Sequence, residues 1–155
     1  RYDAGRWWWE LRLHPRFGSL EFRVPDAQAT VADVAALAAV AQSLVAWLSA
    51  RHDAGERLSV APEWRIAENR WSACRHGVEG TMADLQTGSE APTRERLEAL
   101  LDVLEPFAAR LECSPELRAA RDLVQENGAI RQRVAAADGG ARAVARSLAD
   151  RFLEP

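Results

Sequence analysis

Lysine is absent from this sequence, and cysteine, methionine and tyrosine are scarce. The 20 residues counted as lysine plus arginine are therefore all arginines. Without lysine, the chain cannot form the Schiff bases on which lysine-dependent covalent catalysis relies. Phosphate recognition would have to use arginine forks, histidine, backbone amides or a metal ion. A GC-rich genome also favours arginine and alanine, so the bias alone does not identify a function.

The two cysteines, Cys74 and Cys113, are isolated and show no metal-ligand spacing. We expect both to be small buried hydrophobic residues of a cytoplasmic protein, and we find no signal-peptide pattern. The longest apolar run, residues 31–50, contains Asp33 and Gln42 and predicts a buried helix rather than a membrane span. A net charge of -3 argues against nucleic-acid binding.

Alternating apolar and charged residues between positions 7 and 26 predict a β-hairpin. Residues that face each other across paired strands share one side of the sheet, and Leu13 opposite Leu20 satisfies this rule. The apolar face would then carry Trp7, Trp9, Leu11, Leu13, Leu20, Phe22 and Val24. We expect the tryptophans to pack in the core or at the sheet edge rather than to stack on adenine.

The same register places Arg12 opposite Glu21 and Glu10 opposite Arg23 on the second face of the hairpin. Guanidinium and carboxylate groups side by side suit a metal ion and phosphates. A lone two-stranded hairpin is marginal in water. We therefore expect another part of a larger protein, or another chain, to complete the sheet.

The chain after the hairpin is predicted to be helical, which makes the fold class α+β. Helices are expected to start at Thr30, Pro62, Thr93 and Ser114, and Asp33 completes a variant capping box with Thr30. A further helix precedes Gly139-Gly140, and a last one runs to about Leu153. Residues 77–92 are expected to form a loop or short hairpin. The inward residues are expected to be Val34, Leu37, Ala41, Leu44, Val45 and Leu48 in the first helix and Leu97, Leu100, Leu101 and Leu104 in the third. Pro106 is expected to end or kink that third helix.

The helix predicted from Pro62 to His76 carries a second polar cluster. Arg65, Asn69, Ser72 and His76 recur at helical spacing on one face, whereas Ile66, Ala67, Trp71 and Cys74 form the expected packing side. A solvated face with charge pairs is the simpler interpretation of the polar residues. Asn69 fits it poorly, because asparagine is unfavourable within helices unless it makes a specific hydrogen bond.

Two motifs together make the chain recognisable. RLHPRFGSLEFRVPDAQ, followed by the alanine-rich helix, and ENRWSACRHGVEG resemble the C-terminal half of glutamate–cysteine ligase family 2, the bacterial carboxylate–amine ligases. The resemblance runs from about Trp7 to Arg133 and includes ADLQTG and GAIRQR. One departure is Leu13, where the family usually has proline.

The resemblance implies that residues 1–155 are the C-terminal part of one glutamine-synthetase-like catalytic domain, with the hairpin at 7–26 and the helical region at 30–153. It also implies that ATP phosphorylates the γ-carboxylate of glutamate and that an amine such as cysteine displaces the phosphate. ATP and Mg²⁺ are thus the expected cofactors. Oligomerisation with further copies of the chain is left open.

The resemblance assigns roles residue by residue. Glu21 matches a magnesium ligand, Arg23 a residue that stabilises the moving phosphoryl group, and Arg12 a phosphate or substrate contact. Asn69, Arg70 and Arg75 match the family's helix motif and are expected at the substrate end, although Arg70 serves equally well as a structural ion-pair partner. The alternative for Glu21 is that it only forms a cross-strand salt bridge with Arg12. Asp26 could either orient Arg23 or cap a turn. His14, Arg16 and His76 are expected to have no catalytic role.

The family's N-terminal half supplies paired glutamates for the metal sites, and a single sheet carboxylate does not hold the metals required. We therefore expect no ligation by these 155 residues alone. A related ligase with another acid or amine is one alternative function. A non-catalytic helical interaction module, or an inactive remnant of such a ligase, is the other.

Overall fold

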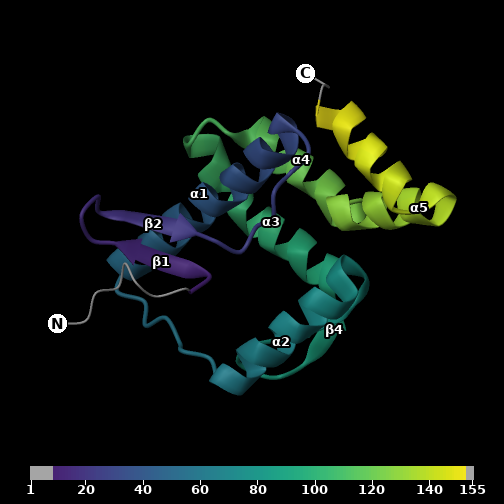
Figure 1. Cartoon of the computed structure of the whole chain (residues 1–155). Coiled ribbons are helices and arrows are strands. Elements are labelled where there is room, and N and C mark those ends of the chain that lie inside the picture. Colours follow the sequence, from purple (N-terminus) through teal and green to yellow (C-terminus); the bar gives the residue numbers. More distant parts are fainter. Residues whose placement is uncertain (1–8, 153–155) are drawn as a thin grey trace.

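The computed structural model describes residues 9–152, which form an α+β structure of helices and two small antiparallel hairpins (Figure 1). The elements are β1 (Leu11–His14), β2 (Ser19–Phe22), α1 (Val31–Asp53), α2 (Glu63–His76), the single 3₁₀ turn η2 (Gly77–Glu79), β3 (Thr81–Ala83), β4 (Glu90–Pro92), α3 (Thr93–Arg110), α4 (Ser114–Gln125) and α5 (Gly128–Phe152). Trp7, Trp8 and Leu153 lie outside the described residues.

Helices α1, α3 and α4 pack against one another and enclose the core. The core residues are Ala36, Ala39, Leu101, Leu104, Ala108, Cys113, Leu117, Ala120 and Val124. Several are alanines, whose small side chains let helix backbones approach closely, and Leu104 is completely buried. Leu97, Leu100, Leu101 and Leu104 of α3 contribute to this core or pack against it, as predicted.

The face of α1 that packs inward matches the predicted stripe only in part, since Leu44 packs against the core as predicted. Thr30 caps the helix by accepting a hydrogen bond from the amide of Asp33, as predicted. The buried residues of α1, however, are Asp33, Ala36, Ala39 and Ser43, whereas the side chain of Val34 is 51% exposed. Alanine dominates this helix, so hydrophobic periodicity did not distinguish its faces. By length and composition α1 could also cross a membrane, but its buried face packs against α3 and α4.

Pro106 does not end α3, because the helix continues through it to Arg110. A proline inside a helix costs about 3 kcal/mol. Leu104 and Ala108 on either side of it are fully buried. The packing of this turn against α1 and α4 therefore offsets the local penalty.

The predicted register of the first hairpin is confirmed, with Arg12 paired with Glu21 and Leu13 with Leu20. The amide of Arg23 donates to the carbonyl of Glu10 at 2.7 Å, which extends the same register by one further pair. The strands themselves are shorter than the predicted span. The apolar face is exposed to solvent along both strands, and the side chain of Leu13 is 63% exposed.

The orientation predicted for α2 is wrong. Its polar residues Arg65, Asn69 and Ser72 hydrogen-bond with backbone atoms of residues 81–86, which include strand β3. The expected packing residues lie outward instead, with Ile66 47% and Trp71 62% exposed. Cys74 is likewise exposed, whereas Cys113 is buried as predicted.

Helix α5 bends at Gly139 and Gly140, as the glycine pair predicted (Figure 1). Gly140 has φ 63° and ψ -157°, a conformation that side chains other than hydrogen disfavour. None of the residues of α5 is buried. Ion pairs of Arg131 with Asp33 and of Arg133 with Glu79 connect this helix to the rest of the described chain.

Candidate functional site

The charged face of the first hairpin brings Arg12, Glu21 and Arg23 together. The Nε atom of Arg12 donates to Oε2 of Glu21 at 2.7 Å, and a second nitrogen of Arg12 lies 2.5 Å from the same oxygen. Arg23 Nε lies 3.5 Å from the other carboxylate oxygen, Oε1. We refer to Arg12, Glu21 and Arg23 as the hairpin triad.

Strand geometry explains why the triad forms. Arg12 and Glu21 are directly opposite each other in the ladder, and Glu21 and Arg23 are two residues apart on one strand, so all three side chains project from one face. Two guanidinium groups against one carboxylate give the triad a net positive charge. The side chains of Arg12 and Arg23 are 22% and 24% exposed, so their charges are partly shielded from water. Such an arrangement is suited to an anionic ligand.

An ion pair connects this surface with helix α2. Arg70 of α2 contacts the carboxylate of Glu10, which lies two residues before Arg12 on the same side of the hairpin. The backbone of Glu10 pairs with Arg23 as the register predicted, while its side chain turns to Arg70. Of the three α2 residues predicted at the substrate end, Arg70 is therefore the one that the structure ties to the hairpin.

Asn69 is fully engaged with the second hairpin. Its amide nitrogen donates to the carbonyl of Ala83, and its amide oxygen accepts from the Ala83 amide, both at 2.8 Å. This pair of bonds imitates a strand partner and anchors β3 against α2. The sequence indicated that Asn69 makes a specific hydrogen bond, and the structure identifies the partner. Arg75 lies exposed in the last turn of α2.

Two arginines support the same hairpin, Arg65 from the predicted polar face of α2 and Arg96, which sequence reasoning missed. Arg65 donates to the carbonyls of Leu85 and Gln86. Arg96 of α3 donates to the carbonyls of Met82 and Ser89, at 2.8 and 2.6 Å. Arginines within amphipathic helices are common, so only the presence of an irregular loop nearby could have suggested these contacts.

The turn between β3 and β4 is organised by Asp84. Its Oδ1 atom accepts hydrogen bonds from the amides of Gln86 and Thr87 and from the hydroxyl of Thr87. The amide and hydroxyl of Thr87, then the amide of Gln86, lower the pKa of the Asp84 carboxyl below its ordinary value. Gly88 closes the turn with φ 79°. This turn is therefore rigidly built around one ionised carboxylate.

The remaining residues considered from the sequence make their contacts outside the triad, although His14 has the parity of Arg12 and so shares its face of the hairpin. Asp26 accepts from the amide of the next residue, Ala27, in the linker before α1. His14 ends β1 and stacks on Phe17, with ring centroids 4.5 Å apart. His76 ends α2 and contacts Trp71 edge-on. Trp9 is exposed at the start of the described chain, where core packing was one expectation.

Magnesium needs several oxygen ligands. The charged face of the hairpin carries Glu21 and Glu10, and the Glu10 carboxylate is engaged by Arg70. Residues 9–152 contain no group of three or more histidine, cysteine, aspartate or glutamate side chains placed to hold a metal ion. Glu21 is also engaged by two guanidinium groups. The described residues therefore do not form a magnesium site by themselves, and Glu21 would contribute to such a site only together with ligands from elsewhere.

Comparison with known proteins gives a consistent result. The model of glutamate-cysteine ligase family 2 (GCS2) matches residues 1–146. A Micrococcus luteus protein named "Putative glutamate--cysteine ligase 2" is 39% identical over 125 residues, which are 81% of this chain and 31% of the relative. A Gloeobacter violaceus protein of the same name is 39% identical over 127 residues, 81% of this chain and 34% of the relative. A Mycolicibacterium smegmatis relative is 38% identical over 143 residues, 90% of this chain and 38% of its own length.

The chain thus spans about a third of the length of the curated relatives that it matches. The family match includes the hairpin triad, helix α2 and the β3–β4 turn. From this match and the shared identity, the chain belongs to glutamate-cysteine ligase family 2.

Proposed function

We propose that this chain contributes part of the active site of an ATP-dependent carboxylate–amine ligase with a glutamine-synthetase-like fold. The observation that carries the proposal is the hairpin triad, two partly shielded guanidinium groups around one carboxylate, in a member of a glutamate–cysteine ligase family. The proposed substrates are ATP, glutamate and an amine such as cysteine. The proposed reaction forms an amide through a γ-glutamyl phosphate.

The triad suits phosphoryl transfer for an electrostatic reason. Phosphoryl transfer builds negative charge on the oxygens of the moving group, and fixed positive charge near it lowers the barrier. In the proposal, Arg23 faces this group, and Arg12 contacts phosphate or a substrate carboxylate. Glu21 fixes the direction of both guanidinium groups and supplies one ligand to magnesium, with other ligands coming from elsewhere in the ligase. Bound magnesium would neutralise phosphate charge.

The proposed roles on α2 differ among the three predicted residues. Arg70 and Arg75 carry charges that can meet a substrate carboxylate. Asn69 has both groups of its side-chain amide bonded to Ala83, so we assign it a positioning role. It holds the β3–β4 hairpin against α2 rather than touching substrate.

The rest of a ligase would complete the sheet and the metal site. The apolar face of the first hairpin is exposed at Leu11, Leu13, Leu20 and Phe22, which is the surface that further strands or a packed layer would cover. We propose that these 155 residues alone do not catalyse ligation, that the complete enzyme does, and that it works in the cytoplasm.

A chimera tests the proposal directly. The matched third of the Micrococcus luteus relative is replaced by this chain, and ADP release is measured with glutamate and a panel of amines. We expect glutamate- and magnesium-dependent turnover that falls at least a hundredfold in the E21Q variant. The E56Q variant is the matched control, because Glu56 also pairs with an arginine, at 2.6 Å, but lies outside the hairpin. A folded chimera without turnover on any amine would count against the ligase assignment.

The second candidate function is a non-catalytic interaction module. Trp64 and Trp71 favour it, because both are 62% exposed and their spacing of seven residues places them on one side of α2, where they offer apolar area for protein contact. The same experiment separates the two. A chimera whose activity is unchanged by E21Q would remove the proposed role of the triad and favour the interaction module.

A further inference from the structure

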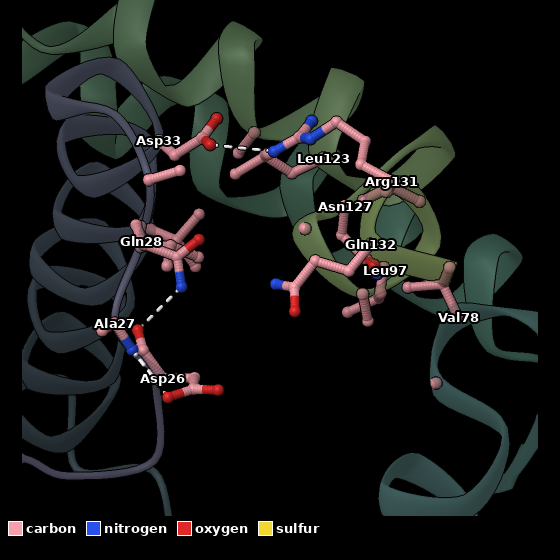
Figure 2. Close-up of a pocket in the computed structure, with 18 of the residues that line it drawn as sticks. Asp26, Ala27, Gln28, Asp33, Val78, Leu97, Leu123, Asn127, Arg131 and Gln132 are labelled. Atoms are coloured by element: carbon pink, nitrogen blue, oxygen red, sulfur yellow. Dashed lines mark hydrogen bonds and ion pairs between the residues drawn. The ribbon is translucent and has the colours of Figure 1, made fainter. Parts of the chain in front are cut away.

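The helical region and the chain that follows the first hairpin enclose a cavity of about 610 Å³, whose lining includes Val24, the residue next to Arg23 of the hairpin triad. It is bounded by the linker before α1 and by parts of all five helices (Figure 2). Its inner walls are aliphatic, with Leu37, Leu97, Leu100 and Leu123 among them. Its size falls within the range of about 300 to 1,000 Å³ that is usual for small-molecule sites.

One wall of this cavity carries excess positive charge. Asp33, whose side chain is only 12% exposed, accepts from Arg131 at 2.8 Å and lies 4.0 Å from a nitrogen of Arg151. Figure 2 shows the Asp33–Arg131 pair at one end of the cavity. Two guanidinium groups thus share one carboxylate, and the wall has a net charge of one positive unit.

Arg131 and Arg151 differ in how many hydrogen bonds their guanidinium groups make within the protein. Arg131 donates to Asp33 and also to the carbonyl of Glu126, so it connects α5 to α1 and to the end of α4. Arg151 meets Asp33 only at 4.0 Å. Its Nε atom is buried and has no hydrogen-bond acceptor within the part of the chain that the structure describes. The side chain as a whole is 31% exposed, so the terminal nitrogens of Arg151, rather than its buried Nε, are the groups that an anionic ligand would meet.

The only other acidic residue on the cavity wall within residues 9–152 is Asp26. It is exposed, at the far end from Arg131, as Figure 2 shows. Solvent screens its charge, so it does not cancel the positive wall. The neutral amide of Gln132 lies between the two ends and adds a further polar group to the cavity.

We propose that this cavity binds a small molecule with one carboxylate and an apolar body, with the carboxylate at Arg151. The aliphatic walls would bury the apolar part, and the guanidinium would take the charge. The inference does not depend on the ligase chemistry. Val24 lines the cavity and has the parity of the apolar face of the hairpin, whereas the triad projects from the opposite face.

The test is a titration of the 155-residue chain with octanoate, followed by amide chemical shifts in ¹H–¹⁵N spectra. The neutral molecule 1-octanol, of the same chain length, is titrated in parallel. We expect octanoate to give saturable shifts at Leu37, Leu97 and Leu123 and to bind at least about tenfold more tightly than 1-octanol. One hydrogen bond to a charged group accounts for a factor of this size.

Two variants and a control identify the site. R151M keeps an apolar stem and leaves the Asp33–Arg131 pair intact, and we expect it to weaken octanoate binding about tenfold without changing 1-octanol binding. L123W fills the cavity, and we expect it to abolish both. R142M is the matched control, because Arg142 is an exposed arginine of α5 that does not line the cavity.

Three results would overturn the proposal. Equal affinities for octanoate and 1-octanol would show that the cavity does not recognise the carboxylate. Shifts confined to the exposed hairpin residues Leu11, Leu13, Leu20 and Phe22 would place the molecule on another surface. Octanoate binding that is unchanged in R151M relative to R142M would remove Arg151 as the anchor. None of these results bears on ADP release by the chimera, so the two proposals fail separately.

Discussion

Replacing Asn69 with alanine should destabilise the protein as a whole, because this side chain holds the β3–β4 hairpin against α2. Both of its amide groups are bonded to Ala83, which is 14 residues away in the sequence. In N69A the amide and carbonyl of Ala83 lose these partners. The change also separates a structural role for Asn69 from direct contact with substrate.

The expected size follows from the two contacts. A typical hydrogen bond contributes about 0.5–1.5 kcal/mol net, so two contribute about 1–3 kcal/mol. Alanine is the better helix former, by up to about 0.7 kcal/mol, which offsets part of the loss. We therefore expect the free energy of unfolding to fall by about 0.3–2.3 kcal/mol. N69D should be at least as damaging at neutral pH, because its carboxylate would face the carbonyl oxygen of Ala83.

Urea denaturation followed by circular dichroism measures this loss. E68A is the control, since Glu68 is the exposed neighbour of Asn69 on α2, and we expect little change there. Unfolding curves for N69A and N69D that coincide with the wild-type curve would refute the positioning role. In the active chimera, N69A should then lower activity by reducing the folded fraction, with little effect on KM.

Two further predictions concern stability. L104A should lower the free energy of unfolding by about 2–5 kcal/mol, because Leu104 is fully buried where α1, α3 and α4 meet, and urea denaturation measures it; a loss below about 1 kcal/mol would contradict this packing. Because the pKa of Asp84 is lowered in the folded state, its charge contributes stability above its ordinary pKa, and that contribution disappears as the pH falls through the folded-state value. The difference in unfolding free energy between the wild type and D84N should therefore be constant near neutral pH and shrink below about pH 4. A difference that grows as the pH falls would contradict a lowered pKa of Asp84 in the folded state.

The sequence predicted the first hairpin well because strand geometry has a strict period of two. Once Leu13 is paired with Leu20, the register also fixes Arg12 opposite Glu21, and the structure confirms this pairing. Helix starts at Thr30 and Ser114 were equally predictable, because capping and first-turn preferences are local. Family membership also followed from the motifs alone, and the comparisons confirm it.

Helix α2 was mispredicted because a helix buries whichever face its partner requires. The partner here is a short hairpin that presents backbone amides and carbonyls, and only polar side chains satisfy these groups. Arg65, Asn69 and Ser72 therefore turn inward, and Trp71 turns outward. Hydrophobic periodicity reports which residues are apolar and carries no information about the chemistry of the neighbour.

Local rules of strand parity and helix capping in the sequence determined the triad and most element boundaries. The tertiary structure alone decided which groups meet across long separations. Asp33 and Arg131 are 98 positions apart and yet share a hydrogen bond, and Arg151 joins them only because α5 bends at Gly140. Contacts of this kind depend on how the helices pack, a global balance of burial and backbone hydrogen bonding that no local pattern encodes.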